Sequence, residues 1–191
     1  DEVDAINLVL ELGVVIVNDS HYLLSLIESL QYDTVYHEHL RYYHLNSVVR
    51  LLSEHGLEVF HVKQIPTHGG SIRIYSGRKG QHEIRDSVSR QLELERQAGL
   101  NDGSAFSTFR ESVLQSKVDL HALIAPILRN RQKIYGIGAP SRASTLINYV
   151  GIDDGMMDCV LEVATSHKIG KYIPGTRIPV IDEAKLYEDQ P

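Results

Sequence analysis

The amino-acid sequence predicts a mixed α/β fold. Short β-branched apolar runs alternate with stretches whose apolar residues recur every three or four positions, the pattern of helices packed on sheets. From residue 133 onward, KIYGIGAPSRASTLINYVGI and then CVLEVA give a strand, a glycine turn, a helix and a second strand. This order is the β-α-β unit of a Rossmann-like sheet. We expect long helices to join it to an earlier group of strands.

The first elements are a strand and a short helix. GVVIV at 13–17 is a continuous β-branched run, which predicts a buried strand in a parallel sheet. HYLLSLIESL at 21–30 follows it, and Asp19 or Ser20 is expected to cap that helix. Its apolar residues share one helical face: Leu23, Leu26, Ile27 and Leu30.

A second helix and an antiparallel pair of strands come next. Asn46 or Ser47 is expected to cap the helix, and Gly56 to supply the left-handed position that ends it. LEVFHVKQI and SIRIYSGR then alternate around a glycine-rich THGG, so residues 57–77 predict two antiparallel strands. Residues 81–131 are rich in Glu, Arg, Gln and Leu, which predicts two long amphipathic helices interrupted near NDGS at 101–104.

Composition excludes several classes of function. The net charge of -6, with both signs interspersed, leaves no basic face for a phosphate backbone, so we expect no nucleic-acid partner. Cys159 is the single cysteine, which excludes a disulfide framework and a thiolate metal site. No apolar run approaches the roughly 20 residues that span a bilayer, and no signal peptide is visible. We therefore expect a cytoplasmic protein without a membrane partner.

YHEHLRYYH at 36–44 concentrates titratable side chains. It fits a surface loop with packed tyrosines and solvated histidines. An extended segment could instead bring His37 and His39 to one face as metal ligands with Glu38, but the usual zinc spacings are absent and we predict no metal. A third interpretation is a general acid/base centre, because a histidine can take a proton that a neighbouring carboxylate and hydroxyl help to handle.

Three blocks in register carry a family resemblance. YDTVYHEHLRYYHLNSVVRLLSEHGLEVFHVKQIPTHGGSIRIY, then YGIGAPSRASTLINYVGI, then HKIGKYIPGTRIPV resemble the back half of the sugar C-methyltransferases, including their C-terminal domain. These enzymes use S-adenosylmethionine and act on nucleotide-linked 4-keto-deoxysugars. The resemblance implies a nucleotide-sugar substrate, and a reaction in which a base deprotonates the carbon beside a ketone before methyl transfer.

The resemblance also implies residue roles. The family pattern Y-x-E-H makes His39 the base, Glu38 its orienter or a sugar contact, and Tyr36 a hydroxyl near the reacting carbons. His37 falls at the variable position. The remaining implied positions, which we expect to bind substrate, are His68, Gly69, Gly70, Gly136, Gly138, Ala139, Ser141, Arg142 and Lys168.

The glycine turn that opens the last helix suits a diphosphate, which backbone N–H groups and the helix dipole would hold. Many relatives have lysine where Arg142 stands, so the charge is kept and its geometry changes. The family's acidic position lies near Glu162. The prolines and glycines of HKIGKYIPGTRIPV are expected to shape a loop.

The resemblance predicts three parts. Residues 1–80 would be the C-terminal part of a class I methyltransferase domain without its first four strands, 81–131 a helical linker, and 132–191 a Rossmann-like C-terminal domain truncated at its end. The main S-adenosylmethionine-binding segment would lie outside this chain, so cofactor-binding residues stay unassigned and we expect a fragment that is inactive alone. An exposed sheet edge could support self-association. Alternatives are a non-catalytic nucleotide-sugar module or an NAD-binding Rossmann protein, although Ser141 breaks the G-x-G-x-x-G fingerprint.

Overall fold

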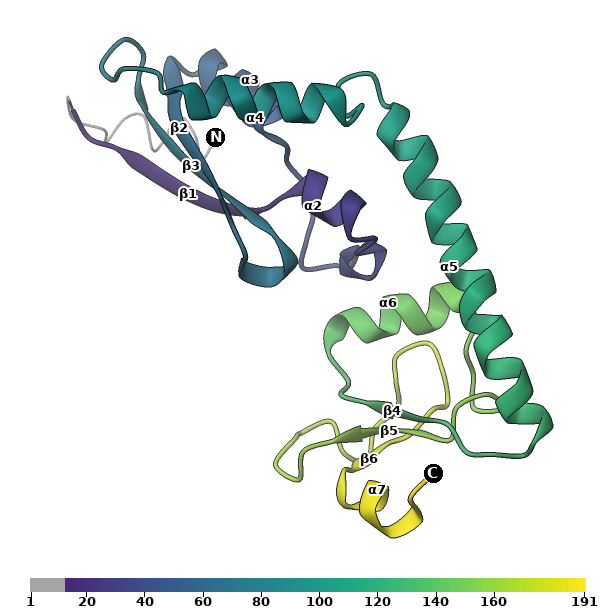
Figure 1. Cartoon of the computed structure of the whole chain (residues 1–191). Helices are drawn as coiled ribbons and strands as arrows, with labels where there is room; N and C mark the ends of the chain where they lie inside the picture. Colours follow the sequence, from purple (N-terminus) through teal and green to yellow (C-terminus); the bar gives the residue numbers. More distant parts are fainter. Residues whose placement is uncertain (1–12) are drawn as a thin grey trace. The chain divides into compact units, whose positions relative to one another are not determined.

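The computed structural model describes residues 13–191 (Figure 1). It is mixed α/β, as predicted, with helices and two three-stranded sheets in the described residues. By contacts the chain divides into two compact units. The first holds 13–31 with Arg41–Arg110, and the second holds Tyr32–Leu40 with Glu111–Pro191. This division does not follow chain order, so the predicted boundaries after residues 80 and 131 stay a prediction.

The sheet of the first unit is antiparallel, with strand order β1-β3-β2. β2 (Leu57–Ile65) and β3 (Ser71–Arg78) form the predicted hairpin, and the short helix η2 (Thr67–Gly69) closes it. β1 (Ile16–His21) pairs with the other side of β3, from Ile16 opposite Ser76 to His21 opposite Ser71.

β1 corrects one expectation. GVVIV was expected to form a buried parallel strand, but the strand begins at Ile16 and runs antiparallel to β3. Val17 is 54% exposed, and Val14 and Val15 are also exposed. A β-branched run favours extended backbone in either direction, so it does not fix the strand's partner or its burial.

α2 corrects a second expectation. The helix spans only Leu23–Glu28, and its N-cap residue is Tyr22 without a side-chain cap. Asp19 and Ser20 lie within β1, where Asp19 pairs with Arg73 instead. The strand continues to His21, so the start of the helix moves past both expected caps.

α3 (Leu45–Glu54) and α4 (Asp86–Gln97) pack on each other through a buried carboxylate. Glu95 of α4 is fully buried and accepts hydrogen bonds from the Leu45 and Asn46 amides, at 2.5 and 3.0 Å. The Tyr22 hydroxyl donates to Glu95 as well, at 2.9 Å, and burial followed by the Glu95 charge raises the pKa of Tyr22. Glu95 therefore caps α3 from another helix, where a negative charge suits the N-terminal dipole.

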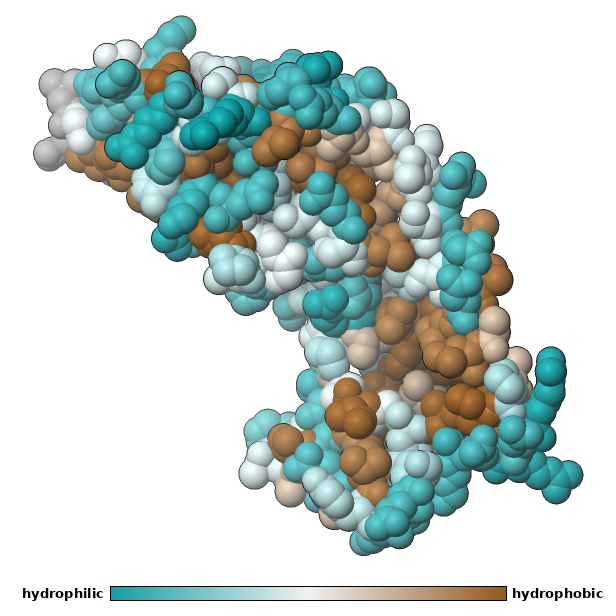
Figure 2. All heavy atoms as spheres, in the orientation of Figure 1, coloured by the Kyte–Doolittle hydropathy of each residue, from teal (hydrophilic) through white to brown (hydrophobic). Residues whose placement is uncertain are grey.

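The predicted helix break and helix end are both confirmed. α4 ends at Gln97, and α5 (Ser104–Arg129) begins at the last residue of NDGS, where Asp102 accepts the Ser104 amide at 2.9 Å. Gly56 follows α3 with a φ of 72°, the left-handed conformation expected there. Figure 2 shows hydrophobic and hydrophilic side chains interspersed along α5.

The second unit contains the predicted β-α-β unit. β4 (Tyr135–Ile137), α6 (Ser141–Val150) and β5 (Cys159–Glu162) follow in order, and β6 (Val180–Asp182) extends the sheet. All three strands are parallel, in the order β4-β5-β6. α7 (Ala184–Asp189) follows β6. The buried core of this unit includes Ile147, Val150, Val160, Ile178 and Val180.

Across the described part of the chain, no helix combines the length and apolarity that crossing a membrane requires.

Candidate active site

The segment that carries the predicted catalytic residues belongs to the second unit. It opens with η1 (Tyr32–Thr34) and continues through tight turns, in which the Tyr36 amide donates to the Thr34 carbonyl and the His39 amide to the Tyr36 carbonyl, each at 3.0 Å. Because this backbone is turned and not extended, His37 and His39 do not share the face of a strand. Within residues 13–191, no three His, Cys, Asp or Glu side chains are grouped to hold a metal ion.

Tyr36 contacts both of the other predicted catalytic residues. Its hydroxyl donates to Glu38 Oε2 at 3.2 Å, and its ring meets the His39 ring edge to face, with centroids 5.2 Å apart. Tyr36 is half-buried, whereas Glu38 and His39 are exposed. A histidine, a carboxylate and a hydroxyl thus lie together where a dissolved molecule can reach them, and these groups can serve general acid/base chemistry.

One face of α6 holds this segment. The Arg142 guanidinium donates from Nε and Nη2 to the two Asp33 carboxylate oxygens, at 2.6 and 2.9 Å. Thr145 Oγ1 donates to the Val35 carbonyl at 3.4 Å, and the Tyr149 ring meets the Tyr32 ring edge to face at 5.2 Å. The sequence alone did not predict these contacts. Its available signal was the spacing of residues 142, 145 and 149, which places them on one helical face.

The glycine turn between β4 and α6 binds the side-chain carboxylate of Glu162. The Ala139 amide donates to Glu162 Oε1 at 2.6 Å, and Lys168 Nζ donates to the Ala139 carbonyl at 2.6 Å. The Ala139 amide, and then Ser166 and Lys168, hold the pKa of Glu162 below its ordinary value. Gly138 adopts a φ of 80° in this turn. A Cβ on Gly136 would lie 3.0 Å from Val160 Cγ2, so close strand packing explains that glycine.

A cavity of about 210 Å³ lies beside this turn. It is lined by three of the residues predicted to bind substrate, Ala139, Ser141 and Lys168, and by a second lysine, Lys171. The remaining lining residues are Pro140, Ser144, Tyr172, Ile173, Pro174 and Val180. Two cations and the start of a ten-residue helix give the cavity a chemistry suited to anions.

The HGG turn belongs to the first unit. His68 is exposed and left-handed, with a φ of 52°. Gly69 accepts a hydrogen bond from Gln31 Nε2 at 2.8 Å. A Cβ on Gly70, whose φ is 120°, would lie 2.4 Å from the Ser25 Cβ. Close packing against α2 therefore accounts for Gly70, and the predicted substrate role of all three residues stays a prediction.

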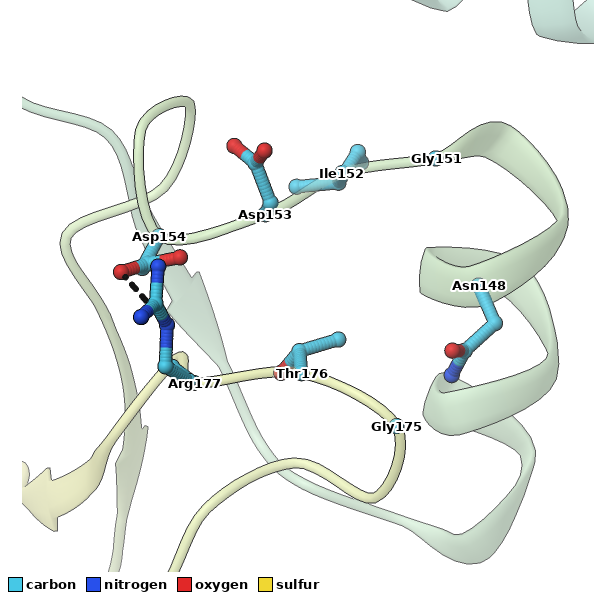
Figure 3. A pocket seen from close by; sticks show the side chains of 8 residues that line it. All are labelled: Asn148, Gly151, Ile152, Asp153, Asp154, Gly175, Thr176 and Arg177. Carbon is cyan, nitrogen blue, oxygen red and sulfur yellow. Dashed lines mark ion pairs between the residues drawn. The ribbon is translucent and has the colours of Figure 1, made fainter.

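A larger cavity, of about 470 Å³, lies elsewhere in the second unit (Figure 3). Asn148 of α6 lines one side, and Asp154 and Arg177 form an ion pair at 3.3 Å on the other. Gly175 is tightly fitted, because a Cβ there would lie 2.3 Å from Asn148 Oδ1. The other lining residues are Gly151, Ile152, Asp153 and Thr176. From the sequence, the prolines and glycines of this segment were expected to shape a loop, and the cavity that the PGTR residues line was not predicted.

Comparison with known proteins identifies the class of protein, the C-methyltransferases, and the fold is consistent with it. The chain belongs to the family described as the C-methyltransferase C-terminal domain, whose model matches residues 66–191. Among individual proteins, it is similar to the C-methyltransferase NovU of Streptomyces niveus, with 31% identity over 160 residues. That similarity covers 83% of this chain but only 38% of NovU. The predicted kinship with the C-terminal part of the sugar C-methyltransferases is therefore confirmed.

Proposed function

We propose that the chain is part of an S-adenosylmethionine-dependent C-methyltransferase that methylates the carbon beside the ketone of a nucleotide-linked 4-keto-deoxysugar. Its family membership and its similarity to NovU support this activity. The observation that carries the proposal is the contact of Tyr36 with both Glu38 and His39. In a C-methyltransferase, these three residue types together suit the removal of a proton from carbon.

In this proposal His39 is the base. Its imidazole takes the proton from the carbon beside the ketone, and the C–H electron pair forms the enolate double bond as negative charge moves to the oxygen. The Tyr36 hydroxyl then turns its single proton from Glu38 to that oxygen and stabilises the charge. The Glu38 carboxylate, which accepts the Tyr36 hydroxyl in this structure, holds that hydroxyl in place before the enolate forms. The resulting carbon nucleophile is ready for methylation.

S-adenosylmethionine would supply the electrophilic methyl group to which the new C–C bond forms. The described residues of the first unit do not fit the part of such an enzyme that binds S-adenosylmethionine, because their sheet is antiparallel and β1 leads to α2 through Tyr22, without a glycine turn. We therefore assign no residue of this chain to the methyl donor.

The cavity beside α6 is the proposed place of the nucleotide diphosphate. Lys168 and Lys171 supply positive charge there, and Ser141 lies in the first turn of the helix. Glu162 already accepts from Ala139, so a diphosphate would have to bind beside this carboxylate or displace it. A cytoplasmic location and self-association through a strand of the first sheet complete the proposal.

Proton exchange tests the proposed base without the methyl donor. The chain is incubated in D2O with a nucleotide-linked 4-keto-deoxysugar, and mass spectrometry follows deuterium entering the carbon beside the ketone. Methyl transfer is not expected of this chain alone, because no residue is assigned to the methyl donor, but proton exchange does not need that donor. We therefore expect exchange above the uncatalysed rate, and a loss of about 100-fold in His39→Gln, because general base catalysis contributes roughly 100- to 10,000-fold.

His37→Gln is the matched control, since it removes a neighbouring exposed histidine from the same segment. It should exchange at the wild-type rate. Equal rates in His39→Gln and the wild type would exclude His39 as the base, and no exchange above background in the wild type would contradict the activity of this chain.

A further inference from the structure

We propose that Arg142 is a positioning residue, which docks the segment Tyr32–Leu40 onto α6 and thereby places the Tyr36, Glu38 and His39 cluster. The inference rests on the proposed function for the role of that cluster. It differs from the expectation that Arg142 contacts the substrate diphosphate.

The ion pair of Arg142 with Asp33 has the geometry of an anchor. Both carboxylate oxygens are used, at 2.6 and 2.9 Å, by two nitrogens of one planar guanidinium. Such a bidentate pair fixes orientation as well as distance. The Asp33 side chain is 19% exposed and that of Arg142 is 42% exposed, so water only partly screens the pair.

The anchor acts close to the proposed catalytic residues. Asp33 lies three residues before Tyr36, and the short turns between them are closed by backbone hydrogen bonds. The hydrogen bond to Asp33, and then the Asp33 charge, raise the pKa of Arg142, and Tyr36 adds a smaller contribution, so Tyr36 lies within electrostatic range of the guanidinium. A shift of the anchor would therefore move the hydroxyl that organises Glu38 and His39.

Two further contacts of α6 act in the same direction. Thr145 binds the carbonyl of Val35, and Tyr149 packs on Tyr32, which puts a contact on either side of the ion pair. The ion pair is the charged and directional member of this set. Without it, the ring contact and one long hydrogen bond would hold the segment less precisely.

A phosphate contact is a different role for the same guanidinium. Arg142 would have to share or leave Asp33 to bind a diphosphate, while Lys168 and Lys171 already line the cavity beside the helix. The two roles predict opposite results when the charges are exchanged. An aspartate at position 142 can pair with an arginine at position 33, but it repels a phosphate.

Amide hydrogen exchange measures docking directly. In Arg142→Ala and in Asp33→Asn, we expect amides of residues 35–39 to exchange about tenfold faster than in the wild type, as the loss of a charge-assisted pair implies. The charge-swapped double variant, Asp33→Arg with Arg142→Asp, should restore most of the protection. Arg177→Ala is the matched control, because it breaks an ion pair in another part of the same unit and should leave residues 35–39 unchanged.

Substrate deuteration separates positioning from phosphate binding. A positioning role predicts that Arg142→Ala lowers the maximal rate with little change in KM, and that the charge-swapped double variant recovers the rate. Unchanged protection of residues 35–39 in Arg142→Ala would overturn the proposal. The same holds if the charge-swapped double variant shows no more protection than the single variants. If the wild type deuterates no substrate, the proposed function fails, while amide exchange still decides whether Arg142 docks the segment.

Discussion

Replacing Glu95 with glutamine removes a charge from the interior of the first unit while keeping the shape of the side chain. The wild-type carboxylate is fully buried and accepts from the Tyr22 hydroxyl and from the Leu45 and Asn46 amides. A glutamine oxygen placed at Oε1 can keep the first two hydrogen bonds. Its NH2 group would then face the Asn46 amide, so one buried donor would meet another donor.

The expected cost follows from these three contacts. The two hydrogen bonds that remain would each lose about 1 kcal/mol, because bonds to charged groups contribute more than neutral ones. The unsatisfied amide would add roughly 1 to 2 kcal/mol. We therefore expect a loss of about 3 kcal/mol in the stability of the start of α3, which corresponds to about a 100-fold change in its opening equilibrium.

Amide exchange at Leu45 and Asn46 is the appropriate assay, because a chain with two compact units need not unfold in a single step. Glu93→Gln is the matched control on the same helix, since Glu93 forms an exposed ion pair with Arg96 at 2.7 Å. Such pairs contribute about 1 kcal/mol or less. If Glu95→Gln and Glu93→Gln changed the exchange of these amides by the same factor, the capping argument would be refuted.

Three further predictions concern single residues. Gly70→Ala should destabilise the first unit by about 2 kcal/mol or more in denaturant unfolding, because its Cβ would meet Ser25 at a backbone angle that alanine avoids; an unchanged midpoint would contradict this. The hydrogen bond from Lys133, as the largest cause, lowers the pKa of Asp189, so this carboxyl stabilises the fold at neutral pH and the contribution fades as acid protonates it. Below pH 4 the protection of α7 amides, taken relative to the intrinsic exchange rate at each pH, should fall in the wild type, and Asp189→Asn should flatten that dependence. Burial raises the pKa of the Cys159 thiol, so alkylation at neutral pH should be slow in the native protein and fast in urea.

Local patterns predicted the elements whose causes are local. The alternation in LEVFHVKQI and SIRIYSGR gave the hairpin, and the glycine turn before a helical run gave the β-α-β unit. The prediction for the first strand was wrong about its partner. Its β-branched residues indicate extended backbone, but the choice of an antiparallel partner depends on β3, more than 50 residues later.

The missed features of the site depend on contacts between distant segments. Asp33 and Arg142 are 109 residues apart, and Glu95 caps a helix that begins 50 residues before it. No spacing rule joins such positions. The Tyr36, Glu38 and His39 cluster could be predicted from the sequence because its members are neighbours in the chain. The larger cavity could not, because its lining residues come from α6 and from the PGTR loop, which are distant in the sequence.

The grouping of Tyr32–Leu40 with Glu111–Pro191 affects how such proteins can be recombined. An exchange of residues 66–191 between two relatives, the span that the family describes, would import Arg142 and leave Asp33 behind. The hybrid would then combine the segment with the proposed base from one parent with the proposed docking helix from the other. Residues 33 and 142 should therefore be inherited together, and a functional chimera would transfer residues 32–40 along with the C-terminal domain.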